Sequence, residues 1–314
     1  MKNLATSKYI ISLIVIVSIL AWSQVYGQNK RNVDSNSKEF KEYWYAGEAE
    51  LTRYELQQAR YGEVHKGDAV LIFVTEDFDT KHQVKHEHGD NSNATPILKL
   101  NFTKKFFTGI YPYSMMSSTF SPVNGNPTIK VTTSTQEWCG HTFSQLNLKN
   151  NEYKGRLHSY FQDEGDQEFS LEAVLLEDEI WTKIRLNPFS LPTGSIKLIP
   201  GTMFLRLKHE DSEIQKAIAT STSFKNPALS KKSLSKYRLE YQDIERVLEI
   251  TFEEAFPYNI LLWEETNKSG FGSNAKIITT RAVRTHSIKT AYWNQHDLSD
   301  ANMRKKLGLD LNNY

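Results

Sequence analysis

From about residue 43 onward, apolar residues mostly alternate with polar ones, and this alternation restricts the possible folds more than any other feature of the sequence. Successive side chains of a β-strand point to opposite faces, so a period of two residues predicts strands with one buried face. The pattern is clearest in the segments 69–75, 128–133, 141–148, 156–161, 203–207, 246–252 and 276–284. We therefore predict a mainly β protein.

Clusters of Gly, Asn, Asp and Ser separate these segments. They lie at 67–68, 124–127, 149–152, 163–166 and 269–273. Such clusters are typical of hairpin turns. Many short strands joined by hairpins predict an antiparallel β-barrel, half-barrel or sandwich.

One stretch, from Leu171 to Leu186, has a helical period instead. Its apolar residues at 171, 174, 175, 181 and 184 lie roughly on one helical face, and Pro188 follows as a stop. We predict one amphipathic helix at about 171–186, with the acidic residues 177–179 on its solvent face. Farther along, the Lys- and Ser-rich stretch 210–235 predicts a long mobile loop around 225–232.

The first 27 residues have the order of a secretory signal peptide. Two lysines precede an apolar run over residues 9–22, and a cleavage pattern ends at Gly27. The run is shorter than the roughly 20 residues of a spanning helix, and no cysteine for lipidation precedes Cys139. We therefore expect cleavage near Gly27, a mature chain without a transmembrane or lipid anchor, and a periplasmic or extracellular location.

The rest of the chain divides by composition. Residues 28–42 are polar and predict a flexible leader, and residues 297–314 predict a polar C-terminal tail. Between them, 43–296 predict a single β-rich domain, whose strand sets 43–169 and 195–293 are joined by the helix.

Charge and cysteine content narrow the class of protein. Cleavage after Gly27 removes two lysines and no acidic residue, so the formal net charge changes from +1 to −1. Nucleic-acid binders carry a basic excess, and a nucleic-acid partner is therefore not expected. A single cysteine excludes an internal disulfide framework, so the core has to hold the domain together.

Five stretches carry a resemblance to known proteins: 47–62, 70–78, 130–140, 191–194 and 257–265. On these, the chain resembles, from about 43 to 293, exported proteins and lipoproteins that carry the family name septum formation inhibitor Maf. The name implies a nucleoside-triphosphate pyrophosphatase, whose Ser-x-Ser-Pro-Arg-Arg phosphate motif is not in this sequence. The order of elements also resembles, more loosely, periplasmic lipoprotein carriers.

Cys139 and His141 form the first candidate site, in the segment Glu137-Trp-Cys-Gly-His141. A thiolate nucleophile needs a base within hydrogen-bond reach, and residues i and i+2 of a strand share one face. The sequence shows no third group to orient the base, and a lone cysteine commonly packs as a small apolar residue. We expect Cys139 to be buried, with a hydrolase as the alternative.

His82, His86 and His88 are candidate metal ligands, because imidazole suits zinc or copper and an i, i+4 pair meets on one helical face. The segment runs into Asp90-Asn-Ser-Asn93, which has the composition of a loop. A solvated loop is the expected structure, and no cofactor is predicted.

Aromatic residues crowd the segment 106–120, and Phe107, Tyr111, Tyr113 and Phe120 are the candidate ligand-binding residues. Such a set lines either a cavity for an apolar or lipid-like ligand or the core of the domain. The leading hypothesis is an exported, non-enzymatic protein of the cell envelope that binds an apolar or lipid-like ligand, or a partner protein, in a β-barrel cavity. The Cys139/His141 hydrolase and the pyrophosphatase are the alternatives, and the oligomeric state is not predicted.

Overall fold

The computed structural model describes residues 35–309, and the predicted signal peptide lies outside this range. The strands are β1 (Ala49–Arg60), β2 (Glu63–Asp79), β3 (Val84–Lys85), β4 (Ala94–Thr108), β5 (Tyr111–Pro122), β6 (Lys130–Glu137), β7 (Gly140–Lys149), β8 (Glu152–Ser159), β9 (Gln167–Glu172), β10 (Leu175–Leu176), β11 (Gly194–Ile199), β12 (Gln215–Phe224), β13 (Leu234–Tyr241), β14 (Arg246–Glu253), β15 (Ile260–Ser269) and β16 (Lys276–Thr290).

The α-helices are α2 (Lys38–Trp44), α3 (Glu177–Leu186), α4 (Thr202–Lys208) and α5 (Asn302–Lys306). Short 3-10 turns lie at η1 (Asn91–Asn93), η2 (Pro188–Ser190), η3 (Gly272–Asn274), η4 (Tyr292–Asn294) and η5 (Leu298–Ala301). The predicted mainly β, antiparallel class is thus confirmed.

All 16 strands belong to one sheet, which is not closed. Its order is β10-β11-β12-β13-β14-β15-β16-β1-β2-β4-β5-β6-β7-β8-β9, and β3 pairs with β2 outside this path. Neighbours are antiparallel except β10 and β11. Because β1 pairs with β16, the first and last strands lie in the middle of the sheet, while the edge strands β9 and β10 are consecutive in the chain.

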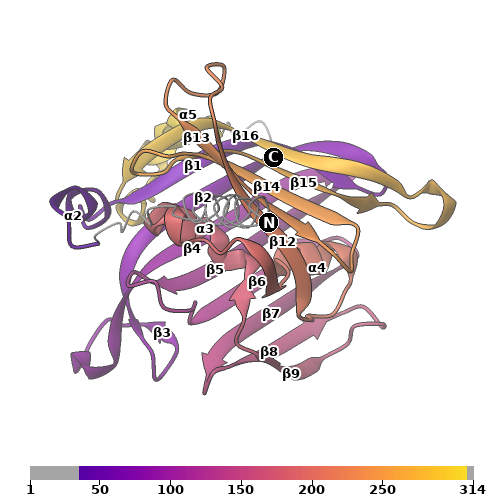
Figure 1. Ribbon diagram of the computed structural model, residues 1–314, viewed down its shortest axis with the longest axis horizontal. Coiled ribbons are helices and arrows are strands. Elements are labelled where there is room, and N and C mark those ends of the chain that lie inside the picture. Colours follow the sequence, from indigo (N-terminus) through magenta and orange to yellow (C-terminus); the bar gives the residue numbers. More distant parts are fainter. Residues whose placement is uncertain (1–34, 310–314) are drawn as a thin grey trace, which may run out of the picture. The chain divides into compact units, whose positions relative to one another are not determined.

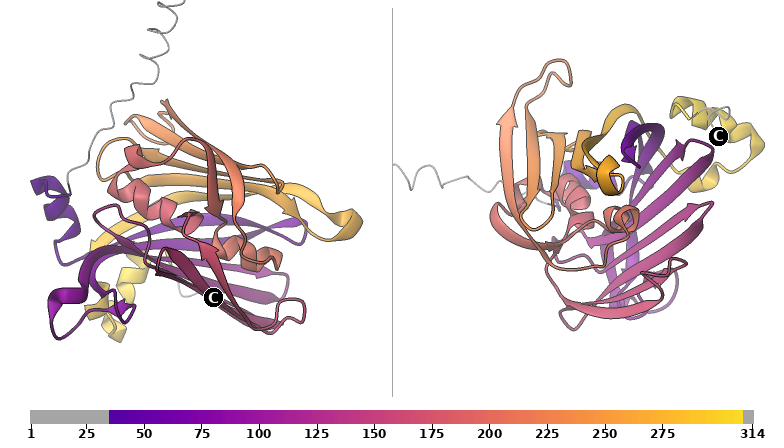
Figure 2. Two further views of the ribbon diagram at one scale, coloured as in Figure 1. Left: turned by 60° about the horizontal axis from the view of Figure 1, so that its bottom comes forward. Right: turned by 90° about the vertical axis from the view of Figure 1, so that its right-hand side faces the viewer.

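The sheet curls around α3 and α4, which lie on its concave face (Figures 1 and 2). Trp181 of α3 meets Phe102 of β4 and Trp263 of β15, with ring centroids 5.2 Å apart in both pairs. Tyr54 of β1 packs 4.6 Å from Trp263. Burying an aromatic side chain of this size contributes about 1.5–3 kcal/mol, so this cluster fixes α3 against the middle of the sheet.

The period-two pattern is visible in the burial of β5. Tyr113, Met115, Ser117 and Thr119 are buried on the concave face, whereas the residues between them are exposed or half-buried. The polar members of the buried set find partners there, since Thr133 of β6 donates to Ser117 over 3.0 Å. The concave face is therefore a mixed polar and apolar layer.

The predicted helix at 171–186 is correct only in its second half. Residues 167–172 pair with β8 as the edge strand β9, and Leu175 and Leu176 pair with β11. Backbone pairing at the sheet edges thus prevails over the helical spacing of the apolar residues in that stretch. The acidic residues 177–179, expected in solvent, are buried because α3 lies on the concave face, within the curl of the sheet.

A second helix was not expected. The stretch 203–207, predicted as a strand, lies inside α4, and both faces of this short helix are buried. A run of five mostly apolar residues fits a buried helix as well as a strand. The predicted loop around 225–232 coincides with the connection 225–233 between β12 and β13, whereas residues 215–224 of the same Lys- and Ser-rich stretch form β12.

The chain ends depart from the predicted leader and tail within the described residues. Helix α2 begins at Lys38, with Ser37 as its N-cap, and buries Phe40 and Trp44. In the C-terminal part, η5 and α5 bring Leu307 into a buried position. Among residues 35–309, no helix is long and apolar enough to cross a membrane.

Candidate functional site

Charged side chains are buried on the concave face, with Arg246 of β14 at their centre. Its Nη2 donates to Glu177 of α3 over 2.7 Å, and its Nε donates to Glu265 of β15 over 2.8 Å. Tyr241 donates a further hydrogen bond to Glu177, and Phe204 of α4 lies 4.0 Å below the guanidinium. One arginine therefore holds two carboxylates and ties α3 to two strands.

The pKa of Glu265 shows which force prevails in this cluster. Burial opposes its ionisation, but the nearby Arg246 and Lys104 outweigh burial and lower the pKa. Lys104 of β4 is itself buried, and burial lowers its pKa, with Glu265 acting in the opposite direction. Glu265 is thus kept as a carboxylate inside the domain.

Asp178, the next residue along α3, behaves differently. It accepts hydrogen bonds from the backbone N of Thr202 over 3.0 Å and from the Thr202 hydroxyl over 2.9 Å. Burial, reinforced by the neighbouring Glu177, raises the pKa of Asp178 to about 6, despite the bonds from Thr202. This carboxyl therefore titrates close to neutral pH.

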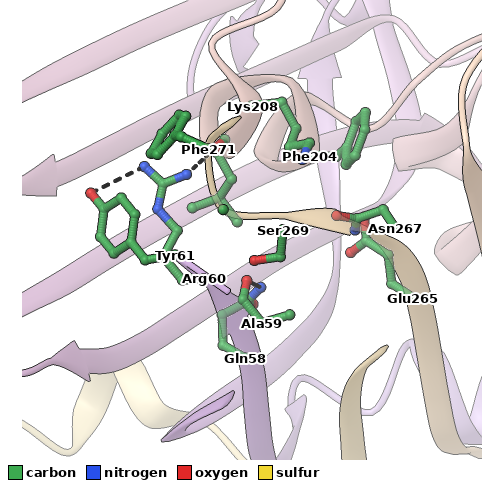
Figure 3. Close-up of a pocket in the computed structure, with 12 residues that line it drawn as sticks. Gln58, Ala59, Arg60, Tyr61, Phe204, Lys208, Glu265, Asn267, Ser269 and Phe271 are labelled. Atoms are coloured by element: carbon green, nitrogen blue, oxygen red, sulfur yellow. Dashed lines mark hydrogen bonds between the residues drawn. The ribbon is translucent and has the colours of Figure 1, made fainter. Parts of the chain in front are cut away.

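A hollow of about 50 Å³ opens beside this cluster at the end of the sheet where β1 turns into β2 and β15 turns into β16, and we call it the rim pocket. Gln58, Ser269 and Glu265 are its most buried polar members, while Tyr61 and Phe271 are exposed. Figure 3 shows Tyr61 and Phe271 on one side and Glu265 on the other. The pocket therefore leads from an aromatic mouth to a charged interior.

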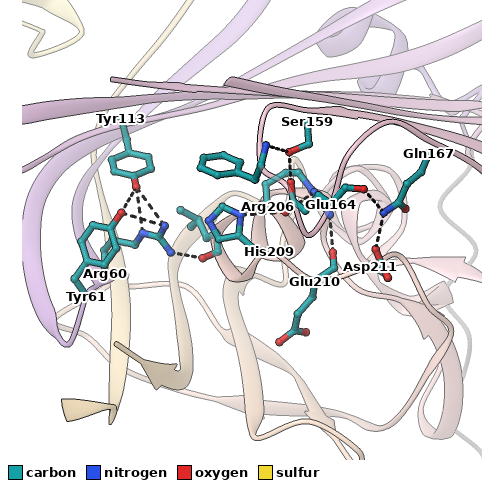
Figure 4. A network of polar contacts seen from close by, with 12 residues as sticks. Arg60, Tyr61, Tyr113, Ser159, Glu164, Gln167, Arg206, His209, Glu210 and Asp211 are labelled. Carbon is teal, nitrogen blue, oxygen red and sulfur yellow. Dashed lines mark hydrogen bonds and ion pairs between the residues drawn. The ribbon is translucent and has the colours of Figure 1, made fainter. Parts of the chain in front are cut away.

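Arg60, at the end of β1, forms one wall of the rim pocket. Its Nη1 donates to the carbonyl oxygen of Leu207, and its Nη2 donates to the Tyr113 hydroxyl over 3.2 Å. The Tyr61 hydroxyl lies 2.7 Å from that of Tyr113, and the Tyr61 ring lies 4.4 Å from the guanidinium (Figure 4). These neutral partners hold the Arg60 side chain, which is only 8% exposed.

A second polar network follows α4, also drawn in Figure 4. Glu164 lies 3.0 Å from Arg206 and 3.0 Å from the Nδ1 atom of His209, and it accepts a hydrogen bond from Ser159. The Phe161 ring packs 4.6 Å from His209. This network pairs its charges internally and closes the loop between β8 and β9 over α4.

An apolar groove of about 330 Å³ lies on the convex face. Its floor is a cross-strand row, in which Leu51 of β1 pairs with Ile288 of β16 on one side and with Ile72 of β2 on the other. Met303 and Leu307, in and after α5, line it from the C-terminal segment. This apolar groove therefore lies outside the curl of the sheet.

The structure places Cys139 in the exposed turn between β6 and β7, so the prediction that it is buried is wrong. Gly140 starts β7, and the tight turn leaves the thiol outside the sheet. The Glu137 carboxylate, which accepts a hydrogen bond from the Cys139 backbone N over 2.7 Å, raises the pKa of the thiol. His141 is exposed on β7. A raised pKa disfavours the thiolate that a nucleophile requires.

The candidate histidines lie in an exposed loop region around β3, as the sequence predicts. His82 pairs with Asp79 over 2.7 Å, and His86 contacts Asn91 over 2.9 Å, while His88 is exposed. Within residues 35–309, no group of three or more His, Cys, Asp or Glu side chains is arranged to hold a metal ion.

The four aromatic candidates do not share one cavity. Tyr113 is buried on the concave face, with its ring 5.8 Å from that of Tyr111. Phe107 is exposed, and Phe120 packs 5.2 Å from Phe78 in a separate cluster. Strand alternation explains this separation, because Phe120 and Tyr113 differ by an odd number of residues on the same strand.

Comparisons with family models, with curated proteins and with solved structures give no match. The resemblance to the Maf-labelled family therefore stays a prediction.

Proposed function

We propose that the protein is an exported binding protein that takes up an elongated apolar or lipid-like molecule in the convex apolar groove. The observation that carries this proposal is the size and lining of the groove. Its volume of about 330 Å³ lies within the range of small-molecule sites, and both its floor and its roof contribute aliphatic side chains, such as Ile72 and Leu307. The ligand class follows the sequence-based hypothesis, but the site moves from the aromatic segment to the other face of the sheet.

The groove also has charged residues, which favour an amphiphile over a pure hydrocarbon. Asp68 lines it and pairs with Arg53, whose Nη2 lies 2.5 Å and whose Nε lies 2.7 Å from the carboxylate. Lys105 and Arg304 line it too. An acyl chain over the aliphatic row, with its polar end toward these charges, matches both kinds of lining.

The site is tested by titrating the purified chain with a fluorescent fatty-acid probe. Ile72→Gln places an amide on the aliphatic floor, and we expect at least a tenfold loss of affinity, since fully burying such an aliphatic side chain contributes about 1.5–3 kcal/mol. Ile218→Gln on β12, at a half-exposed position outside the groove, is the matched control and should bind normally. Equal binding by both variants, or none by the unaltered protein, would contradict the proposal.

Export is tested separately. N-terminal sequencing of the protein recovered from its producing cells should begin near Gln28, after the predicted signal peptide. An N-terminus at Met1 would contradict export without affecting the groove.

A further inference from the structure

The charges around the rim pocket are not balanced. Four cations lie in or beside it, and two carboxylates face them: Arg60, Lys104, Lys208 and Arg246 against Glu177 and Glu265. Asp178 is a further acid on which Arg246 acts, and one positive charge remains in excess when it is ionised. Farther out, Lys268 and Glu210 flank Lys208 with opposite charges. The pocket is therefore an electropositive region in the interior of the domain.

The two carboxylates are already engaged by a single cation. Arg246 bonds both Glu177 and Glu265, and Tyr241 adds a hydrogen bond to Glu177. Arg60, in contrast, donates only to neutral oxygens, and Lys208 donates to the carbonyl oxygen of Lys268. Burying a cation without a counter-charge is costly, and Arg60 is only 8% exposed, so an anion between it and the half-buried Lys208 would stabilise the arginine.

A third polar group lines the same hollow. Gln58 is 2% exposed, and its Nε2 donates to Thr280 over 3.0 Å and to the carbonyl oxygen of Ala59 over 3.1 Å. Its Oε1 has no hydrogen-bond partner among the described residues. Buried acceptors of this kind normally have a donor, and here the donor has to come from what enters the pocket.

We propose that the rim pocket binds the anionic group of a hydroxyl-bearing ligand, a carboxylate or a phosphate, between Arg60 and Lys208, with the ligand hydroxyl donating to Gln58. The hollow of about 50 Å³ has room for this group and little more. The rest of the ligand leaves over Tyr61 and Phe271, which are 38% and 69% exposed and whose rings lie side by side, 6.0 Å apart. This site is independent of the convex groove.

Isothermal titration of the purified protein with glycolate and with glycerol phosphate tests the site. Both probes carry an anionic group and a hydroxyl, and sodium chloride at the same ionic strength is the blank. We expect saturable binding that Lys208→Gln weakens about tenfold and Arg60→Gln weakens more, because a charge-assisted hydrogen bond contributes about 1.5–3 kcal/mol. Lys276→Gln, an exposed lysine at the start of β16, is the control and should bind normally.

Two further variants separate loss of binding from loss of folding and test the role of the ligand hydroxyl. Arg60 also supports Tyr113, so Lys208→Gln, which removes only one surface contact of α4, decides the case if Arg60→Gln does not fold. Gln58→Leu should weaken glycolate binding while leaving acetate, which has no hydroxyl, unchanged. Absence of saturable binding at millimolar probe, or identical affinities in the Lys208→Gln variant and the unaltered protein, would overturn the site.

The source of the anion is distinguished by one more pair of probes. A short-chain phosphatidic acid that binds more tightly than glycerol phosphate, with the gain removed by Phe271→Ser, identifies a lipid headgroup. Equal affinities identify a free hydroxylated anion. Either result supports the anion site, and neither depends on the fatty-acid probe of the convex groove.

Discussion

The two faces of the sheet both depart from a simple division into an apolar inside and a polar outside. The concave face, covered by α3 and α4, encloses ion pairs such as Arg246–Glu177 and Arg185–Glu50. The convex face carries the aliphatic row of Leu51, Ile72 and Ile288 under the C-terminal segment. The alternation of a strand decides which of its side chains are buried. Whether charged side chains can be buried there depends on the partners that the covering helices supply.

Buried charges on the concave face link its helices to its strands through hydrogen bonds of defined geometry. Arg185 of α3 donates to both oxygens of Glu50 on β1, over 2.5 and 2.6 Å, and to the carbonyl oxygen of Pro257. A buried ion pair contributes little net stability against an apolar replacement, but removal of one partner is costly. Single substitutions of buried charges on the concave face should therefore lower the free energy of unfolding more than substitutions on the convex face.

The largest effect is expected at Arg246. Arg246→Met leaves Glu177 and Glu265 buried without their cation, and we expect the free energy of unfolding to fall by about 3–5 kcal/mol. Urea denaturation measures the change. The control is Arg281→Met, whose pair with Glu264 is partly exposed and should cost less than about 1 kcal/mol. Similar losses in the two variants would show that the buried ion pairs of the concave face contribute no more to stability than an exposed pair does.

The next effect concerns pH and Asp178. Its pKa is raised to about 6 in the folded state, above its ordinary value of 3.8, so the folded state binds this proton more tightly than the unfolded chain. Stability should therefore rise as pH falls from about 6 to about 4, by the order of 2 kcal/mol. Asp178→Asn should flatten this rise.

Glu50 provides the internal contrast for that experiment. Its pKa is lowered to about 2, because Arg185 and Tyr43 outweigh the effect of burial. Its contribution to stability is therefore lost only as pH falls from about 4.5 toward 2. A stability curve of the unaltered protein that falls steadily from pH 6 would contradict the assignment for Asp178.

On the convex face, the C-terminal segment gives a smaller expected effect. Leu307→Ala should lower the free energy of unfolding by about 2 kcal/mol, near the low end for buried leucines, because Leu307 lies over a hollow rather than in a filled core. Leu298→Ala in the same segment is the control, since Leu298 is 98% exposed. Equal melting temperatures of the two variants would show that the segment does not roof the groove.

The smallest effect is expected at Cys139, which belongs to neither face. Cys139→Ser should change stability by less than about 0.5 kcal/mol, because the turn is exposed. The thiol should be fully alkylated in the native protein, slowly near neutral pH, since Glu137 raises its pKa. Glu137→Gln should speed the reaction, and a thiol that reacts only after unfolding would contradict its exposure.

The antiparallel β class follows from the sequence because alternation and turn clusters are local signals. The buried charges also leave a signal in the sequence. Lys104 is in phase with Leu100, Phe102 and Phe106, the buried positions of β4, and Arg246 is in phase with Leu248 of β14. A charged residue in phase with buried ones marks a polar interior.

Other parts of the candidate sites could not be predicted. Glu265 lies beside Arg246 because β14 pairs with β15, but Glu177 lies 69 residues away and reaches Arg246 only because the sheet curls around α3. The convex groove depends on a C-terminal segment whose composition predicts a polar tail. Helix α4 was mistaken for a strand because a short apolar run carries no period of its own.

Because β1 pairs with β16, the order of the strands in the sheet differs from the order in which they are synthesised. The middle of the sheet cannot form until residues 276–290 are available, and such long sequence separations slow folding. The edges, in contrast, are joined through Ala173 and Val174, between β9 and β10. Opening the chain there and linking its natural ends would produce a circular permutant in which strands pair in the order of synthesis, with the same native contacts and faster folding.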